Sequence, residues 1–274
     1  MILIVASNKD VAGLNIKKQI LELYPFDKTD EKHQNNTIYK AVINNTEIKL
    51  ATINEEPVQA QNLLNFFPSP KLVIFISRHS SLSGKPTLSV HTPGNLSNAT
   101  LGGIQKRVSI SPANAMKTTL KTMATLREEK QLSYEVSYEC THHGPSIDAP
   151  TMFAELGSSP AQWHDSKAAE VVAHAVIETS SKFNQHPQSA VLGIGGQHYN
   201  SKFTRMALEE ETAFGHMIPK HAIAAINSET LKYCVERTLE TVEYAILDWK
   251  GIKGENKQPL IKMLDEAGLA FKKA

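Results

Sequence analysis

Short apolar runs alternate with longer segments of helical periodicity along most of the chain. Val11, Leu14 and Leu21 recur at the spacing of one helix face, whereas residues 71–77 (KLVIFIS) form the apolar run of a buried strand. The pattern predicts strands at residues 2–7, 37–43, 46–53, 71–77, 133–140, 189–196, 213–218 and 243–249. It predicts helices at residues 9–23, 58–67, 113–130, 166–183, 201–211, 228–239 and 256–271.

This alternation of strands and helices indicates the α/β class, with a parallel core to the sheet. The Asn44–Asn45 turn predicts a hairpin between the second and third strands, so the sheet is mixed. Residues 78–112 are rich in Gly, Ser, Pro and Thr and are too long for an ordinary connection, which is typical of functional or disordered loops. Without an internal repeat or a low-complexity linker, we expect residues 1–274 to form a single α/β domain with a mixed, mostly parallel central sheet flanked by helices.

Composition narrows the class of protein further. Hydrophobic residues make up 41% and charged residues 21%, as in globular proteins, and the net charge of +1 excludes a uniformly basic DNA-binding surface. The cysteines, Cys140 and Cys234, form no disulfide framework, which suits a reducing compartment. No run approaches the roughly 18 to 20 apolar residues that a membrane span needs. We therefore expect a soluble, cytoplasmic monomer with no membrane or DNA partner.

Histidines stand directly after the ends of three predicted strands. They are His79, His142, His143 and His198. In open α/β sheets, ligands bind outside the carboxyl ends of parallel strands, so these imidazoles converge if the strands are parallel neighbours. Three independent strand ends with the same residue type indicate a functional site. The residues expected to act in catalysis are His142, His143 and His79.

Neutral imidazole is the commonest metal ligand in proteins, and a catalytic zinc site takes three protein ligands and leaves one position for water. The predicted ligands are His79, His142, His198 and Glu155, the lone carboxylate of an apolar run. Adjacent residues on an extended backbone point to opposite faces, so His142 and His143 are expected to have different roles. The alternative is metal-free catalysis, in which a histidine acts as general base and Asp148 or Glu155 orients it.

Two loops offer groups for an anionic or polar substrate. The glycines of GIGG (residues 193–196), between a buried strand and a helix, leave backbone N–H groups that suit an anion, although the string is neither a phosphate-binding P-loop nor a complete dinucleotide fingerprint. The loop RHSSLSGKPTLS offers a guanidinium, an ammonium and several hydroxyls. The expected substrate-binding residues are Arg78, Lys85, His91, Gly195, Gly196 and Gln197.

Three strings carry a family resemblance. SRHSSLSGKPTLSVHTPGN, ECTHHGPS and GIGGQHYNSKFTRMALE, in this order, resemble the archaeal and plant type of D-aminoacyl-tRNA deacylase. The resemblance covers most of the chain and implies hydrolysis of the ester between a D-amino acid and the 3′-terminal ribose of a mischarged tRNA. It also implies zinc as cofactor, and a fold similar to that of peptidyl-tRNA hydrolase and purine nucleoside phosphorylase.

With so small a net charge, tRNA would be held by local basic patches. The candidate lysines are Lys17, Lys18, Lys117, Lys121, Lys257, Lys262, Lys272 and Lys273. An alternative function is that of a zinc-dependent amidase or peptidase on a small acylated substrate, because the same ligand types would serve it. A nucleoside phosphorylase-like enzyme and a non-catalytic tRNA-binding module are weaker alternatives.

Overall fold

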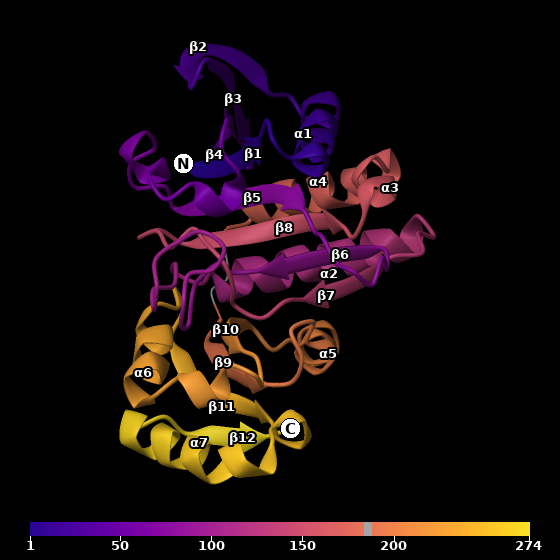
Figure 1. The fold of residues 1–274 in the computed structure, drawn as a ribbon. Coiled ribbons are helices and arrows are strands. Elements are labelled where there is room, and N and C mark those ends of the chain that lie inside the picture. The colour runs from indigo at the N-terminus through magenta and orange to yellow at the C-terminus, as the bar shows by residue number, and fades with distance from the viewer. Residues whose placement is uncertain (184–187) are drawn as a thin grey trace.

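Twelve strands form two sheets in the computed structural model, which describes residues 1–183 and 188–274 (Figure 1). The eight-stranded sheet has the order β2-β3-β4-β1-β5-β8-β6-β7. Its strands are β1 (Ile2–Ser7), β2 (Asp27–His33), β3 (Asn36–Ile43), β4 (Thr46–Ile53), β5 (Leu72–Arg78), β6 (Thr87–His91), β7 (Glu135–Tyr138) and β8 (Thr151–Gly157). The four-stranded sheet has the order β10-β9-β11-β12 and consists of β9 (Ala190–Gly195), β10 (Phe214–Ile218), β11 (Val242–Asp248) and β12 (Phe271–Lys273).

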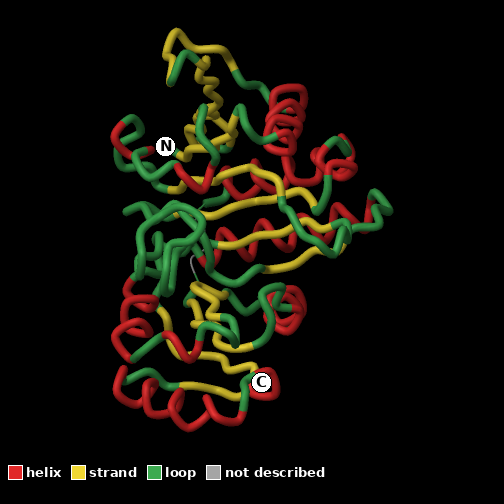
Figure 2. Tube along the Cα trace, in the orientation of Figure 1, coloured by secondary structure: helices red, strands yellow, loops and turns green. Residues whose placement is uncertain are grey.

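Helices fill most of the connections between the strands (Figure 2). They are α1 (Val11–Leu23), α2 (Ala113–Glu129), α3 (Pro160–Trp163), α4 (Ser166–Ser181), α5 (Ser201–Glu209), α6 (Ser228–Glu236) and α7 (Gly254–Ala267). Asp165 accepts hydrogen bonds from the backbone of Lys167 and Ala168 and so caps α4, as its position before the helix predicts. Short 3-10 turns lie at Pro57–Gln59, Leu63–Asn65, Ile223–Ala225 and Trp249–Gly251.

The direction of the strands decides where the site lies. In the large sheet, β4, β1, β5 and β8 are parallel neighbours, but β6 pairs antiparallel with β8, and β7 runs parallel to β6. In the small sheet all pairs are parallel. The expected α/β fold with a mixed, mostly parallel sheet and flanking helices is therefore confirmed. That the last four strands form a separate sheet is a feature that the hydrophobic pattern does not reveal.

Both sheets contribute to one hydrophobic cluster. Helices α1 and α4 pack on the large sheet through residues such as Ile16 and Val172, and α2 lies between that sheet and β10 of the small one. Phe203 of α5 and Phe214 of β10 belong to the same cluster, whereas α6 and α7 cover the other face of the small sheet. The shared cluster is what one domain requires, and the expectation of a single domain over residues 1–274 stays a prediction.

The other face of the large sheet carries no helix among residues 1–183 and 188–274, and irregular segments cover it instead. The helix expected at residues 58–67 is wrong: two 3-10 turns lie there, because Ala60, after the first turn, and Leu63, in the second, are buried separately against the sheet. Residues 78–112 are ordered and contain β6, which the sequence did not predict. The rest of residues 78–112 is held over this face of the sheet by β-bridges between Pro93 and His142 and between Gly94 and Val108.

Candidate active site

The floor of the site is formed by side chains that alternate along β5, β8 and β6. Glu155 of β8 lies opposite Ser77 of β5 on one side and opposite Ser89 of β6 on the other. The Ser77 hydroxyl donates a hydrogen bond of 2.8 Å to Glu155 Oε1. Since residues two apart on a strand share a face, the pairing places the Glu155 carboxylate on the face without helices, where it is 5% exposed.

An aromatic layer supports the floor one step along the same strands. The rings of Phe153 and His91 stack at 5.0 Å with an angle of 8°, and Phe75 stacks on the far side of Phe153 at 4.8 Å. His91 is fully buried, with Nε2 3.7 Å from Glu155 Oε1. The imidazole is thus fixed in orientation by the ring that it covers.

Glu139 is the residue that connects the parts of the site, and the sequence analysis did not single it out. Its Oε2 lies 2.9 Å from Nε2 of His198 and 3.6 Å from Nε2 of His142. Its Oε1 lies 3.1 Å from Nδ1 of His79. The carboxylate is 1% exposed, so its charge is compensated by these imidazoles rather than by water. The sequence does contain a signal for Glu139, because this residue follows a buried strand and stands three positions before His142.

The chain segments that follow β7 and β9 pair with each other and bring the two sheets together at the site. Glu139 forms an antiparallel bridge with Tyr199. The N–H of Cys140 donates to the carbonyl of His198 at 2.9 Å, and the N–H of Asn200 donates to the carbonyl of Tyr138 at 3.1 Å. This pairing places His198 beside Glu139 although the two residues follow strands of different sheets.

His142 and His143 point to the same side of the chain, which corrects the expectation that they diverge. Their ring centroids lie 4.2 Å apart. The backbone at His143 is not extended, because its φ of 40° is in the left-handed region, which β- and γ-branched side chains rarely adopt. Both rings also contact His91, at 4.3 and 4.8 Å between centroids.

Three of the imidazoles direct one ring nitrogen at a backbone carbonyl. His142 Nδ1 lies 2.8 Å from the carbonyl oxygen of Cys140, His143 Nδ1 2.7 Å from that of Gly144, and His91 Nδ1 3.4 Å from that of Thr92. A carbonyl accepts only, so Nδ1 carries the proton and Nε2 keeps its lone pair. This is the arrangement by which proteins prepare imidazoles as metal ligands or proton acceptors.

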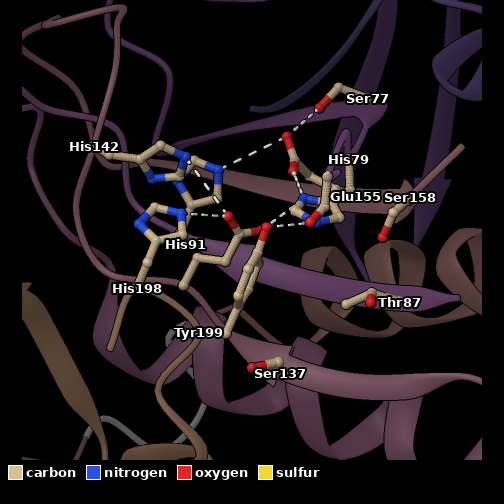
Figure 3. Close-up of polar contacts among 12 residues, drawn as sticks. Ser77, His79, Thr87, His91, Ser137, His142, Glu155, Ser158, His198 and Tyr199 are labelled. Atoms are coloured by element: carbon tan, nitrogen blue, oxygen red, sulfur yellow. Dashed lines mark hydrogen bonds and ion pairs between the residues drawn. The ribbon is translucent and has the colours of Figure 1, made fainter. Parts of the chain in front are cut away.

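His79 lies between the two carboxylates and a phenol. Nδ1 is 3.1 Å from Glu139 and 3.3 Å from Glu155, and Nε2 is 3.1 Å from the hydroxyl of Tyr199 (Figure 3). Burial by itself would lower the pKa of His79, but the two carboxylates outweigh burial and raise this pKa to about 11. Tyr199 was not predicted as a site residue, although it follows His198 directly.

The pKa values of His142 and His143 shift in the opposite direction. Burial, followed by the neighbouring rings of His91 and His143, holds the pKa of His142 well below its usual range. Burial and then His91 lower the pKa of His143 to about 4. For Glu139, burial opposes ionisation, but the contacts with His198 and His79 hold the pKa of the carboxyl well below its usual range. At neutral pH the site therefore combines ionised carboxylates and a protonated His79 with the neutral rings of His142 and His143.

A pocket of about 560 Å³ opens onto these groups. The predicted residues that line it are Arg78, His79, His142, His143, Glu155 and His198. Arg78 is held at the rim, because its guanidinium lies 3.0 Å from Glu56 and 3.8 Å from Asp10. Burial raises the pKa of Asp10 to about 6 in spite of this guanidinium.

The other expected substrate-binding residues lie outside the pocket. His91 is beneath it, in contact with Glu155, and Lys85 is exposed on the loop before β6. Gly195 and Gly196 form the turn after β9, and their φ angles of 106° and 74° explain why glycine is needed there. Gln197 is exposed beside this turn. Their role in substrate binding stays a prediction.

The expected reason for the convergence is wrong in part. We predicted that carboxyl ends of parallel neighbouring strands bring the histidines together, but β7 runs antiparallel to β5, and β9 belongs to the other sheet. The histidines converge because the chain after β7 folds back over the face of the sheet and pairs with residues 198–200. The cluster of His79, His91, His142, His143 and His198 with Glu139 and Glu155 is called the histidine cluster below.

Within residues 1–183 and 188–274, three sets of side chains bring ligand atoms within 4.8 Å of one another, as a metal ion requires. They are His91, His142 and His143; Glu139, His142 and His198; and His79, Glu139 and Glu155. The predicted ligands His79, His142, His198 and Glu155 are all members, but they are divided among these sets and joined by Glu139, His91 and His143. His91 Nε2 is buried and makes no hydrogen bond in the described part of the chain. Two buried carboxylates and an imidazole lone pair without a donor fit a divalent cation.

Imidazoles and buried carboxylates that converge on one pocket of an α/β fold are the groups of acid–base and metal-assisted hydrolysis. The chain belongs to the D-aminoacyl-tRNA deacylase family, whose sequence model matches residues 66–272. Proteins named D-aminoacyl-tRNA deacylase from Thermococcus onnurineus and Pyrococcus furiosus are each 34% identical to it, over 99% of this chain and 99% of theirs. The Methanococcus maripaludis (strain C5) protein of the same name is 34% identical over 92% of this chain and 98% of its own.

A solved structure has the same fold. The crystal structure described as that of a conserved protein of unknown function has a TM-score of 0.87 and 29% identity, and covers 100% of this chain and 95% of its own. The structure of futalosine hydrolase from Helicobacter pylori, with a TM-score of 0.44 and 14% identity, is too distant to test the expected similarity to peptidyl-tRNA hydrolase and purine nucleoside phosphorylase. That similarity stays a prediction.

Proposed function

We propose that this protein hydrolyses the ester bond of D-aminoacyl-tRNA and releases the free D-amino acid and tRNA. The observation that carries the proposal is the histidine cluster, because two ionised carboxylates, a protonated His79 and the neutral rings of His142 and His143 open onto one pocket of a chain with this family membership. Family membership supplies the substrate, and the cluster supplies the groups that ester hydrolysis needs. These are an acceptor for the proton of water and donors for the oxygen atoms of the ester.

The chain's own residues have distinct parts in this proposal. The carboxylates of Glu139 and Glu155 hold His79 from one side, so that its Nε2 reaches the Tyr199 hydroxyl. Tyr199 lines the pocket, and because its oxygen faces Nε2 of His79, its O–H is the group that donates to an ester oxygen. His143, with Nδ1 directed at a carbonyl, presents Nε2 as the proton acceptor, whereas the same arrangement in His142 leaves its Nε2 available as a metal ligand.

The cofactor in this proposal is zinc, held by members of the histidine cluster. The donor types, the three compact sets and the buried His91 Nε2 without a hydrogen bond support it. A bound zinc ion lowers the pKa of water to about 7 and polarises a carbonyl group. Glu139 and His142 each belong to two of the three sets, so both are ligands in the proposed site.

The proposed partner is the aminoacylated 3′ end of tRNA, and the proposed location is the cytoplasm. None of the described helices combines the length and apolar character that crossing a bilayer requires. A monomeric state and the absence of DNA and membrane partners stay predictions.

The first experiment measures release of tyrosine from D-Tyr-tRNA and from L-Tyr-tRNA, with and without a zinc chelator. The proposal expects rapid loss of the D-ester only, abolished by the chelator and restored by zinc. Activity that persists after complete zinc removal would leave the proposed substrate standing but refute zinc as the cofactor. Absence of turnover of both esters by the zinc-loaded protein would refute the proposed function and lead to tests of the amidase alternative on N-acyl amino acids.

Matched histidine variants test the site. His142→Ala and His143→Ala should each lower kcat by orders of magnitude while the fold survives, because both rings lie in the pocket wall. His164→Ala is the control, because His164 is an exposed histidine at the end of α3. Equal activity in all three variants would contradict the assignment of the site.

A further inference from the structure

The carboxyl ends of the small sheet form one edge that begins at the histidine cluster. All four strands are parallel, so the residues that follow β10, β9, β11 and β12 lie along the same side (Figure 1). The residues after β9 include His198 of the cluster. In parallel sheets such an edge is where ligands bind.

Contacts continue along this edge, away from the site. The N–H of Lys220, after β10, donates to the carbonyl of Gly196 at 3.0 Å. Asp248, at the end of β11, pairs with Lys202 at 2.7 Å, and its side chain lies against the turn of Gly196. Gly196 precedes His198 by two positions, so the edge is physically continuous with the pocket.

Beyond Asp248 the edge becomes basic around one aromatic ring. The ammonium groups of Lys273, in β12, and Lys257, in α7, lie 4.0 and 4.7 Å from the centroid of Trp249. Lys250, next to Trp249, is exposed. The indole fixes the ammonium groups without neutralising them, because a cation–π contact leaves their charge and N–H donors available.

The carboxylates of this region are already paired. Asp248 is bound to Lys202, and Glu255 lies 3.8 Å from Lys253. Within residues 1–183 and 188–274, no ion pair of 4.0 Å or less involves Lys220, Lys250, Lys257 or Lys273. These four lysines, together with Trp249, are called the basic edge.

We propose that the basic edge binds the phosphate backbone of the RNA whose 3′ end enters the pocket. This inference rests on the proposed function. It adds to the pocket a surface that holds the part of the RNA lying outside the pocket. Phosphates are the fitting ligand, because ammonium groups without ion pairs attract a chain of single negative charges without any base-specific contact.

The other candidate lysines are less suited to this role. Lys18 and Lys262 pair with carboxylates one helical turn away, and Lys117 and Lys121 both pair with Glu211. A lysine that is already paired releases less free energy when it binds a phosphate. The structure thus favours Lys257 and Lys273 among the candidate lysines and adds Lys220 and Lys250 to them.

The test compares two esters in zinc-loaded protein: D-Tyr-tRNA and the D-tyrosyl ester of adenosine, which lacks the RNA. The variant Lys250→Ala/Lys257→Ala/Lys273→Ala should raise KM for D-Tyr-tRNA about tenfold or more, with kcat nearly unchanged. Its kcat/KM for the adenosine ester should equal that of the parent. The slope of log KM against log salt concentration should fall by about 2, since each lost phosphate contact reduces it by about 0.7.

Two control variants accompany it. Lys18→Ala/Lys28→Ala/Lys32→Ala removes as much charge from the other end of the molecule, where α1 and β2 lie (Figure 1), and should leave KM unchanged. Lys250→Arg/Lys257→Arg/Lys273→Arg keeps the charge and should retain tRNA binding. An unchanged KM in the alanine variant, or an equal rise of KM in the distant control, would refute the proposal that the basic edge binds RNA. Failure of the parent to hydrolyse either ester would instead refute the proposed function.

Discussion

The carboxylate of Glu139 lies 2.9 Å from Nε2 of His198, although the two residues are 59 positions apart and follow strands of different sheets. The contact depends on the pairing of the chain after β7 with the chain after β9. Neither sheet alone contains a complete site, so the junction between the sheets creates the histidine cluster.

Glu139→Gln tests this relationship. The amide keeps the shape of the side chain but removes the charge that faces His198, His142 and His79, so we expect kcat/KM to fall about 100-fold or more. The bound zinc per chain, measured by atomic absorption, should fall as well. Glu135→Gln, at an exposed position of β7, is the matched control and should change neither quantity. Full activity and full zinc content in the Glu139 variant would contradict its central position.

Zinc should also stabilise the folded protein. A ligand that binds only the native state at a concentration of 100 times its Kd adds about 2.7 kcal/mol, which corresponds to a rise in Tm on the order of 5–10 °C for a chain of this size. The rise should disappear in the variant His142→Ala, because His142 belongs to two of the three candidate ligand sets. Thermal unfolding with chelator and with zinc measures it. A Tm that zinc leaves unchanged in the chelator-treated protein would argue against a zinc site.

The aromatic layer under the site should matter for stability. Phe153 is 1% exposed and lies between His91 and Phe75, so Phe153→Ala should lower the free energy of unfolding by about 3–5 kcal/mol. Phe66→Ala is the comparison, because Phe66 is 61% exposed and should cost less than about 1 kcal/mol. Urea denaturation at neutral pH distinguishes the two, and equal losses would show that the stack does not support the floor.

His216 should make stability depend on pH. Burial lowers the pKa of His216 to about 4 in the folded protein, from an ordinary value of 6.5. The unfolded chain therefore binds more protons between these values, and stability present above pH 6.5 is lost as the pH falls toward 4. The loss reaches roughly 3 kcal/mol at most.

Urea denaturation between pH 7 and pH 4 measures this effect. His216→Gln removes the titrating group, so the difference in unfolding free energy between parent and variant should shrink as the pH falls. Because the other titrating groups are common to both proteins, a constant difference would exclude this role of His216.

Much of the fold follows from local pattern. The apolar runs of β1, β5 and β9 and the periodicity of α1, α2 and α4 were predictable, because strands and helices impose periods of 2.0 and 3.6 on side chains that face a core. β8 was missed, because a single apolar run interrupted by Glu155 has no recognisable period. The helix expected at residues 58–67 was wrong, because contacts with the sheet outweighed a weak helical pattern.

By itself, the sequence determined the α/β class, most strands and helices, and the histidines and Glu155 as candidate site residues, because residue type and spacing are local properties. Only the tertiary structure decided which of them meet. It brought in Glu139 and Tyr199, turned His142 and His143 to the same side, and left Lys85 outside the pocket. Strand direction and the pairing of segments distant in sequence decide these contacts. Neither can be predicted from the local residue pattern around the site.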